Sequence, residues 1–346
     1  MSGEILEREI LEQPARLESF LKDEGSAVGE IAAALRGRFR YVVIAARGTS
    51  DNAARYAKYL LGAHNRISVA LATPSLFTLY RQPPSMEGAL VIGISQSGRP
   101  PDIVSVLAEA HRQGCPTLAI TNQPGSPLAE TADYMVNLQA GEEKAVAATK
   151  TYTASLAALA LFSAHLAQDT HRLGALQALP SKAAETLQAN RAVLQAAERY
   201  RYMEHCAVIG RGFNYATAFE ISLKIKELTQ TVAEPYSSAD FLHGPIALVH
   251  RGFPVMVISP SGAVFEDLRG LIRRLQSLRA ELLIVADSDE LLGESHLAMP
   301  IAAGIPEWLS PVLTVLPGQL FALALARARG LDPDQPPGLT KVTETW

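Results

Sequence analysis

The chain has 346 residues, a length that predicts roughly two domains of ordinary size. Hydrophobic residues make up 48% and charged residues 19%, so we expect a well-filled core and exclude general disorder. The formal net charge of −4 argues against nucleic acid as the main ligand, because a phosphate backbone requires a basic surface.

Two stretches of the chain are typical of α/β domains, and each follows amphipathic helical sequence. Residues 5–37 and 177–200 have apolar residues at three- and four-residue steps, which predicts helices. Strands are expected near residues 41–45, 89–94, 116–121 and 134–138, and again near 206–209, 254–258, 282–285 and 298–301. Short β-branched runs that alternate with helical periods predict parallel sheets covered by helices.

The second α/β stretch repeats the first. Residues 94–98 (ISQSG) align with residues 258–262 (ISPSG), and 259 − 95 gives an offset of 164. At the same offset Arg47-Gly48 aligns with Arg211-Gly212, and the tetrapeptide ALAL at residues 158–161 recurs at residues 322–325. Several matches in one register predict an internal duplication, and therefore two similar domains.

The loops after the first two strands of the first copy carry clustered polar side chains. One loop contains Thr49 and Ser50, and the other contains Ser95, Gln96 and Ser97, each with a neighbouring glycine. Such loops lie at the carboxyl edge of a parallel sheet and at helix N-termini, where N–H groups attract phosphate. For either loop alone, helix capping remains an alternative.

The second copy has lost this polar pattern. Phe213 aligns with Thr49, and Pro260 aligns with Gln96. A ring replaces a hydroxyl at the first position, and proline removes an N–H donor and an amide side chain at the second. We therefore expect one phosphate site, which lies in the first domain.

One helix of the second copy carries candidate acid–base residues. Glu220, Lys224 and Glu227 are spaced i, i+4 and i+7, so they project from one helical face. At the offset of 164 the first copy has Tyr56, Leu60 and Ala63, none of which is an acid or base near neutral pH. The alternative is a solvated salt-bridge stripe, but the helix is otherwise largely apolar.

These motifs resemble the sugar isomerase (SIS) family. The loops at residues 48–50 and 95–98 look like its phosphate loops, and the segments 145–150, 220–227, 241–245 and 334–341 resemble, in order, the isomerase domain of glucosamine-6-phosphate synthase. The resemblance implies an α/β fold of two tandem SIS domains, each a flavodoxin-like three-layer sandwich. It divides the chain into residues 1–176, residues 177–330 and a tail, 331–346, that closes the active site.

The chain also departs from the synthase. It lacks the N-terminal glutaminase domain with its cysteine nucleophile, so it resembles more closely the stand-alone SIS-type glucosamine-6-phosphate deaminases. Arg99 and Pro100 replace an acidic residue and a threonine, and Leu242 replaces a lysine. Pro100 is therefore not expected to be a phosphate ligand.

The resemblance assigns roles to individual residues. Glu227 would carry the proton between C2 and C1, Lys224 would polarise sugar oxygens and Glu220 would hold Lys224. His243, fixed by apolar neighbours and a Gly-Pro turn, would open the pyranose ring in the neighbouring subunit's site, which implies a homodimer. Lys341 would form a Schiff base or hold the open chain, with Val342 and Trp346 docking the tail. The loop residues Val146, Ala147 and Ala148 would bind sugar hydroxyls through their backbone groups.

The expected function is cofactor-free and metal-free deamination of an amino-hexose 6-phosphate. Three alternatives remain: another aldose–ketose isomerase, a deglycase, or a non-catalytic sugar-phosphate sensor. The two cysteines, Cys115 and Cys206, make neither a disulfide framework nor a metal cluster. Since the sequence has no secretory segment and its apolar run at residues 154–166 is too short to span a bilayer, we expect a cytoplasmic protein without membrane contact.

Overall fold

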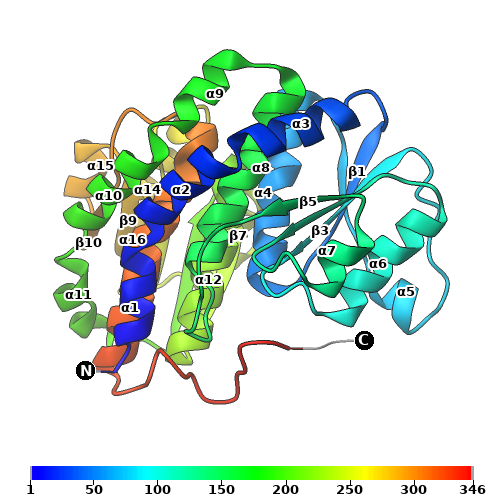
Figure 1. Ribbon diagram of the computed structural model, residues 1–346. Coiled ribbons are helices and arrows are strands. Elements are labelled where there is room, and N and C mark those ends of the chain that lie inside the picture. Colours follow the sequence, from blue (N-terminus) through cyan, green and yellow to red (C-terminus); the bar gives the residue numbers. More distant parts are fainter. Residues whose placement is uncertain (1, 344–346) are drawn as a thin grey trace. The chain divides into compact units, whose positions relative to one another are not determined.

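The structure is a computed structural model that describes residues 2–343, so Trp346 of the predicted tail lies outside the described residues (Figure 1). The chain folds into two compact units, each built around one sheet. The first-sheet unit contains residues 15–143 and 150–177 and the tail from residue 340. The second-sheet unit contains residues 2–14, 144–149 and 178–339. The predicted domain boundaries at residues 176 and 330 remain predictions.

The first-sheet unit has five parallel strands in the order β2-β1-β3-β4-β5. This is the flavodoxin-like order predicted from the resemblance. The strands are β1 (Tyr41–Ala45), β2 (Val69–Leu71), β3 (Ala89–Ser95), β4 (Thr117–Thr121) and β5 (Tyr134–Asn137). The helices are α2 (Gln13–Asp23), α3 (Gly25–Leu35), α4 (Gly48–Asn65), α5 (Ser75–Thr78), α6 (Pro101–Arg112), α7 (Pro127–Thr131), α8 (Lys150–Ala167) and α9 (Thr170–Leu176).

Helices cover both faces of this sheet, which makes three layers. Alternate strand residues such as Val43 and Val91 pack against Ile103 and Leu107 of α6. The intervening residues, including Ile44 and the rest of β3, are also buried, and α4 packs on α8 over that second face. In Figure 1, α6 and α7 lie on one side of β3 and β5, and α4 lies on the other. Strands buried on both faces explain the nearly continuous apolar runs in the sequence.

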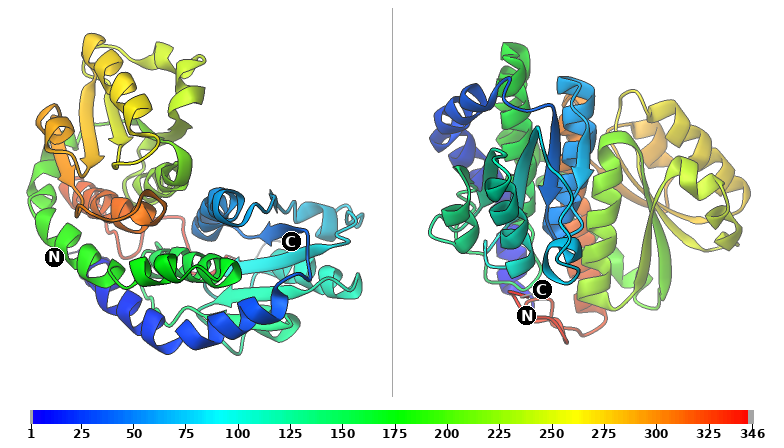
Figure 2. Two further views of the ribbon diagram at one scale, coloured as in Figure 1. Left: turned by 90° about the horizontal axis from the view of Figure 1, so that it is seen from above. Right: turned by 90° about the vertical axis from the view of Figure 1, so that its right-hand side faces the viewer.

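The second-sheet unit repeats this plan. Its strand order, β10-β9-β8-β6-β7, is the first order read from the other end. The strands are β6 (His205–Gly210), β7 (Val232–Ser237), β8 (Pro254–Ile258), β9 (Glu281–Ala286) and β10 (Leu297–Pro300), and they can be followed from green to orange in the left view of Figure 2. The helices are α1 (Glu4–Leu11), α10 (Leu179–Ala189), α11 (Val193–Ala196), η1 (Ala197–Tyr200), η2 (Gly212–Asn214), α12 (Tyr215–Thr229), α13 (Ser238–Leu242), η3 (Pro245–Leu248), α14 (Phe265–Ser277), α15 (Asp289–Gly293), η4 (Glu307–Leu309) and α16 (Ser310–Ala328).

The predicted duplication is confirmed element by element. Adding 164 to the first residue of β1, β4 and α6 gives the first residue of β6, β9 and α14 (41 to 205, 117 to 281, 101 to 265). The equivalent strands also occupy equivalent places in the two sheets. Each copy therefore folds in the same way, and any division of labour between the copies must lie in their loops and helix surfaces.

Within residues 2–343, one helix is both long and apolar enough to cross a membrane. Residues 307–328 have a mean hydropathy of 1.7, and the whole apolar window is buried inside the protein. Helix α16 packs against α12 and α10, and its Gly318 lies so close to α12 that an added Cβ would stand 2.4 Å from Ile221 Cδ1. A helix that is apolar on all sides is typical of a core, and α16 is the central helix of the second-sheet unit.

Candidate functional site

The two polar loops of the first copy lie where a flavodoxin-like sheet binds ligands. The strand order reverses between β1 and β3, and ligands bind in the crevice at such a switch point. Thr49 and Ser50 follow β1 in the first turn of α4, and Gln96 and Ser97 follow β3. All four are half-buried, and Ser95 is buried. The structure therefore places the predicted phosphate residues at one sheet edge.

The loop after β3 is held open by its own hydrogen bonds. Ser95 Oγ accepts a hydrogen bond from Gly98 N at 3.1 Å. Gly98 has φ +61°, and a Cβ there would lie 2.0 Å from Ser126 Oγ, so only glycine fits. Leu128 N donates to the Gly98 carbonyl at 3.0 Å. The loop is thus fixed in shape before any ligand binds.

An ion pair joins the starts of the helices that follow these loops. Arg47, the residue before α4, donates from Nε to Asp102 Oδ2 at 2.8 Å, and the Asp102 side chain is fully buried. The other carboxylate oxygen of Asp102 accepts from Ile103 N at 2.9 Å in the first turn of α6. The sequence reasoning assigned no role to either Arg47 or Asp102. The pair neutralises Arg47 and sets the spacing of the two helix N-termini.

A hollow adjoins the loop after β3. Its volume is about 440 Å³, and it is lined by Ser97, Arg99, Gln123, Gly125, Ser126 and Pro127. Arg99 is exposed there, one residue after Gly98. A cationic side chain therefore lies beside this loop.

The equivalent loop of the second copy already holds internal anions. Ser261 donates to Asp287 Oδ1 from its N–H at 2.8 Å and from its hydroxyl at 2.9 Å. Ala263 N donates to Glu307 Oε2 at 2.5 Å, and a Cβ on Gly262 would lie 2.2 Å from that oxygen. Carboxylates thus accept the hydrogen bonds that a phosphate would need, which agrees with a single phosphate site in the first copy.

Helix α12 carries a buried charged set. Lys224 Nζ lies 2.5 Å from Glu227 Oε2 and 3.5 Å from Glu220 Oε1. The side chains of Glu220 and Lys224 are 0% and 1% exposed, whereas that of Glu227 is 22% exposed. The alternative interpretation, a solvated stripe of salt bridges, is therefore wrong, because two of the three side chains are buried. Buried charges are costly to desolvate, so their presence in an apolar helix favours a functional role.

The first copy has no such chemistry at these positions. Tyr56 is fully buried on α4, and burial raises the pKa of its phenol far above the ordinary value. Leu60 is buried and apolar. At these aligned positions the first copy therefore offers no group that could transfer a proton near neutral pH.

His243 lies in an exposed position. It follows α13, where its N–H donates to the Asp240 carbonyl at 3.1 Å, and Gly244 turns the chain with φ +140°. Phe241 is buried in the core, but Leu242 and His243 are exposed. Of the apolar neighbours expected to fix the ring, Phe241 is buried, as is Ser238 at the start of α13, whereas Leu242 is exposed, so their role in fixing the ring stays a prediction.

The loop before α8 is fixed on its N–H side. Lys144 N and Ala145 N donate to the Glu9 carboxylate at 2.5 and 3.3 Å. Val146 N donates to the Asp334 carbonyl at 3.2 Å, so this N–H is already engaged. The carbonyl group of Val146 is therefore the backbone group that could contact a ligand. Ala148, two residues before α8, is half-buried.

Lys341 contacts a buried carboxylate that the sequence reasoning missed. Its Nζ lies 3.0 Å from Glu143 Oε2, and the Glu143 side chain is 0% exposed. Glu143 also accepts hydrogen bonds from Thr151 N at 3.2 Å and Thr151 Oγ1 at 2.9 Å. The repeat holds a signal for it, since 307 − 143 is 164 and Glu307 is the carboxylate in the second copy's loop.

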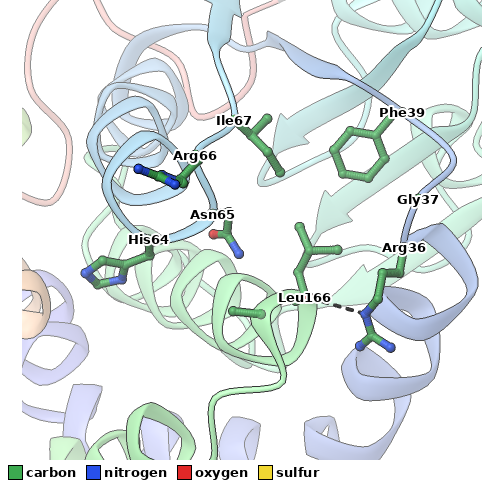
Figure 3. A pocket seen from close by; sticks show the side chains of 9 residues that line it. Arg36, Gly37, Phe39, His64, Asn65, Arg66, Ile67 and Leu166 are labelled. Atoms are coloured by element: carbon green, nitrogen blue, oxygen red, sulfur yellow. Dashed lines mark hydrogen bonds between the residues drawn. The ribbon is translucent and has the colours of Figure 1, made fainter.

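A second hollow of the first-sheet unit lies at the opposite edge of the sheet from the two polar loops (Figure 3). It measures about 310 Å³ and is lined by Arg36, Gly37, Phe39, His64, Asn65, Arg66, Ile67, Leu166 and Ala167. Phe39 and Ile67 precede β1 and β2, so the hollow adjoins the amino ends of the strands. Arg36 donates there to the Leu166 and His165 carbonyls, which places it as a cap of α8.

Comparison with known proteins places these features in a family. The SIS domain matches residues 39–164 and 201–328. The chain belongs to the SIS family, with two SIS domains. The glutamine–fructose-6-phosphate aminotransferase (isomerizing) of Aquifex aeolicus is 35% identical over 339 residues, which is 96% of this chain and 56% of that protein. The chain therefore spans about half the length of this curated relative and corresponds to its isomerase part.

Solved structures agree with the tandem SIS fold. The C-terminal domain of glucosamine-fructose-6-phosphate aminotransferase from Francisella tularensis has a TM-score of 0.86 at 26% identity, with 96% of this chain and 98% of that chain covered. A glucosamine-6-phosphate deaminase of Thermotoga maritima has a TM-score of 0.81, with 99% and 100% covered. Its identity is 24%, so that likeness shows the fold alone.

Proposed function

We propose that this protein is a glucosamine-6-phosphate deaminase of the SIS family. It moves a proton between C2 and C1 of an amino-hexose 6-phosphate and releases ammonia and a ketose 6-phosphate. We propose further that it works in the cytoplasm as a homodimer. The observation that carries this proposal is the buried Glu220–Lys224–Glu227 set, whose terminal carboxylate alone is partly exposed.

The first copy supplies the phosphate contacts. Thr49, Ser50, Gln96 and Ser97 offer hydroxyl, amide and N–H donors beside the N-termini of α4 and α6. Arg99 adds a positive charge at the edge of the same loop. The second copy's donors are already engaged by Asp287 and Glu307, which supports binding of one phosphate per chain.

The second copy supplies the acid–base chemistry. His243 passes a proton to the ring oxygen, and the ring opens to the aldehyde. Glu227 removes the C2 proton, which gives an enolamine, and then returns a proton to C1. The product is a ketose imine at C2, which water hydrolyses to the ketone and ammonia. Lys224 stabilises the oxygen that gains negative charge, and its own charge is balanced by Glu220.

The remaining residues hold the open chain. Lys341 binds the carbonyl end of the open sugar, either as an ammonium or through an imine. Carbonyl groups of the loop at Val146 and Ala148 accept hydrogen bonds from sugar hydroxyls. The exposed position of His243 favours its use in the site of a second subunit, because a ring without apolar cover in its own chain is free to enter another.

A second candidate is aldose–ketose isomerisation of a hexose phosphate without loss of nitrogen. The curated relative at 35% identity is named for an isomerising reaction, and the same Glu227 would perform the proton transfer. The two candidates differ only in the group at C2 of the substrate.

One assay separates them. The purified protein is incubated with glucosamine 6-phosphate, galactosamine 6-phosphate and their amine-free aldose phosphates, and both ammonia and ketose phosphate are measured. We expect equal amounts of ammonia and ketose from an amino sugar. Ketose from the amine-free sugars alone would favour the isomerase. Tight binding with neither product would favour a sensor.

A further inference from the structure

Glu143 is a carboxylate with no exposed surface in its side chain, and it has a specific set of donors. Thr151 donates to both of its oxygens, from N to Oε1 and from Oγ1 to Oε2, in the first turn of α8. Lys341 donates to Oε2 from the tail. Thr151 lies on the long buried helix α8 and fixes the orientation of the Glu143 carboxylate. The position of this anion therefore does not depend on the tail.

Two side chains of the tail, Asp334 and Lys341, form hydrogen bonds with other parts of the chain. Asp334 accepts hydrogen bonds from Ile5 N and Leu6 N at 3.2 and 2.8 Å at the start of α1. The residues that follow have no helix or strand, and residues 337–340 are exposed. The next ion pair along the chain is Lys341 with Glu143, and the Lys341 side chain is only 25% exposed. This ion pair holds the Lys341 ammonium against the first-sheet unit.

We propose that Glu143 is the positioning residue of Lys341. Its buried carboxylate holds the tail lysine at a fixed point of the first-sheet unit, ready to meet the open sugar. The catalytic meaning of this placement rests on the proposed function, but the placement itself does not. A carboxylate that is itself held by a buried helix is the kind of support that presents an amine accurately.

The repeat gives Glu143 a counterpart with a different partner. Glu307 occupies the same place in the second copy, where it accepts from Ala263 N in the former phosphate loop. In the first copy Glu143 instead accepts a hydrogen bond from Lys341. It does not fill the loop at residues 95–98, where we propose that the ligand binds. One ancestral carboxylate position therefore fills a loop in one copy and anchors the tail in the other.

Acylation of lysine amines tests the placement directly. The whole protein is treated with limiting acetic anhydride, and the modification of Lys341 is followed by peptide mass spectrometry. In Glu143→Gln the amide still accepts from Thr151, but the charged partner is lost. Labelling of Lys341 should rise on the order of tenfold, since a hydrogen bond between charged groups is worth about a factor of ten or more. Thr151→Val should give a smaller rise.

A matched pair controls for general loosening. Lys182 and Glu185 are also 3.0 Å apart, but the Glu185 side chain is 57% exposed. Glu185→Gln should leave labelling of both Lys182 and Lys341 nearly unchanged, because exposed pairs contribute little. Unchanged labelling of Lys341 in Glu143→Gln, in a protein that still folds, would overturn the proposal.

Turnover distinguishes positioning from simple support. With an active enzyme, Glu143→Gln should lower kcat with little change in KM, and Glu143→Asp should recover part of the loss. In a Lys341→Met background Glu143→Gln should have no further effect on kcat, because both changes remove the same function. Additive losses would contradict the proposal. If the wild type shows no turnover, the proposed function fails, whereas the labelling result still decides the role of Glu143.

Discussion

At the scale of single residues, the two copies make opposite predictions for equivalent serines. Ser50→Ala with Ser97→Ala should raise KM for the sugar phosphate far more than it lowers kcat. Both hydroxyls would bind the phosphate alike in substrate and transition state, and loss of such uniform binding appears in KM. Steady-state kinetics on the double variant measure the effect.

Ser261→Ala is the internal control for this prediction. Its hydroxyl donates to Asp287 in the second copy, so its loss should leave KM unchanged. If the first-copy double variant kept its KM, or if Ser261→Ala raised KM equally, the phosphate cradle would lie elsewhere.

His64, which lines the hollow in Figure 3, makes a prediction about acid stability. Burial, and secondarily the charge of Arg172, lowers the pKa of His64 from 6.5 to about 4. Between pH 6.5 and 4 the unfolded chain takes up a proton that the folded protein resists, so stability falls as the pH falls through this window. His64→Gln should flatten that part of the profile in denaturant unfolding. An unchanged profile would show that His64 is not linked to folding.

The amino-acid sequence was sufficient to predict the polar loops of the first copy and the charged face of α12 in the second copy. It did not predict Glu143 or the pair of Arg47 with Asp102. These contacts join residues far apart in the sequence, and a lone glutamate or arginine has no spacing pattern that distinguishes it from a solvated one. The exposure of His243 could not be predicted from the local sequence either. Its neighbours are apolar, and the sequence does not show which of them are buried in the fold.

At the scale of elements, the charged set on α12 predicts an uneven response to mutation. Lys224→Met leaves Glu220 buried without its cation, which should cost about 3–5 kcal/mol of unfolding free energy. Lys226→Met, on an exposed position of the same helix, should change stability little. Urea unfolding measures both. Equal losses of unfolding free energy in the two variants would show that removal of Lys224 leaves no costly buried charge.

Adding Glu220→Gln to Lys224→Met removes both buried charges and should recover much of the loss. If the double variant were less stable than Lys224→Met alone, the Glu220 carboxylate would have found another partner.

Element positions were predicted well for the inner strands and for the edge strands β5 and β10, but the other two edge strands were not predicted. The predicted strands at residues 41–45 and 254–258 match β1 and β8. The edge strands β2 and β7 were missed, because β2 has only three half-exposed or exposed residues and β7 contains Pro235, which is typical of an edge. The helix predicted over 5–37 is three helices, broken at Glu12 and Glu24.

At the scale of the whole molecule, duplication produced two similar sheets with separate tasks. Both copies keep the same strand order, but the loop donors of the second copy bind Asp287 and Glu307, and the buried charged set lies on α12 of that copy. The repeat offset in the sequence was sufficient to predict this asymmetry, because aligned positions could be compared directly. What it could not predict was the filling of the second loop by Asp287 and Glu307.

The proposed homodimer predicts complementation between inactive subunits. His243→Ala and Glu227→Gln should each be nearly inactive alone. If His243 acts in the partner's site, random re-pairing of equal amounts makes half of the dimers mixed, each with one intact site, so activity should return to about a quarter of wild type. Activity after mild dissociation and re-pairing measures this. No recovery, in mixed dimers verified by mass spectrometry, would place His243 in the site of its own chain.

The central claim is that Glu227 carries the proton between C2 and C1. Exchange of the C2 hydrogen of glucosamine 6-phosphate with deuterium from D2O, followed by NMR, tests it most directly. The wild type should catalyse this exchange together with ammonia release, and Glu227→Gln should slow both by about 10² to 10⁴, a loss typical of a general base. Wild-type rates of both exchange and ammonia release in Glu227→Gln would contradict the account.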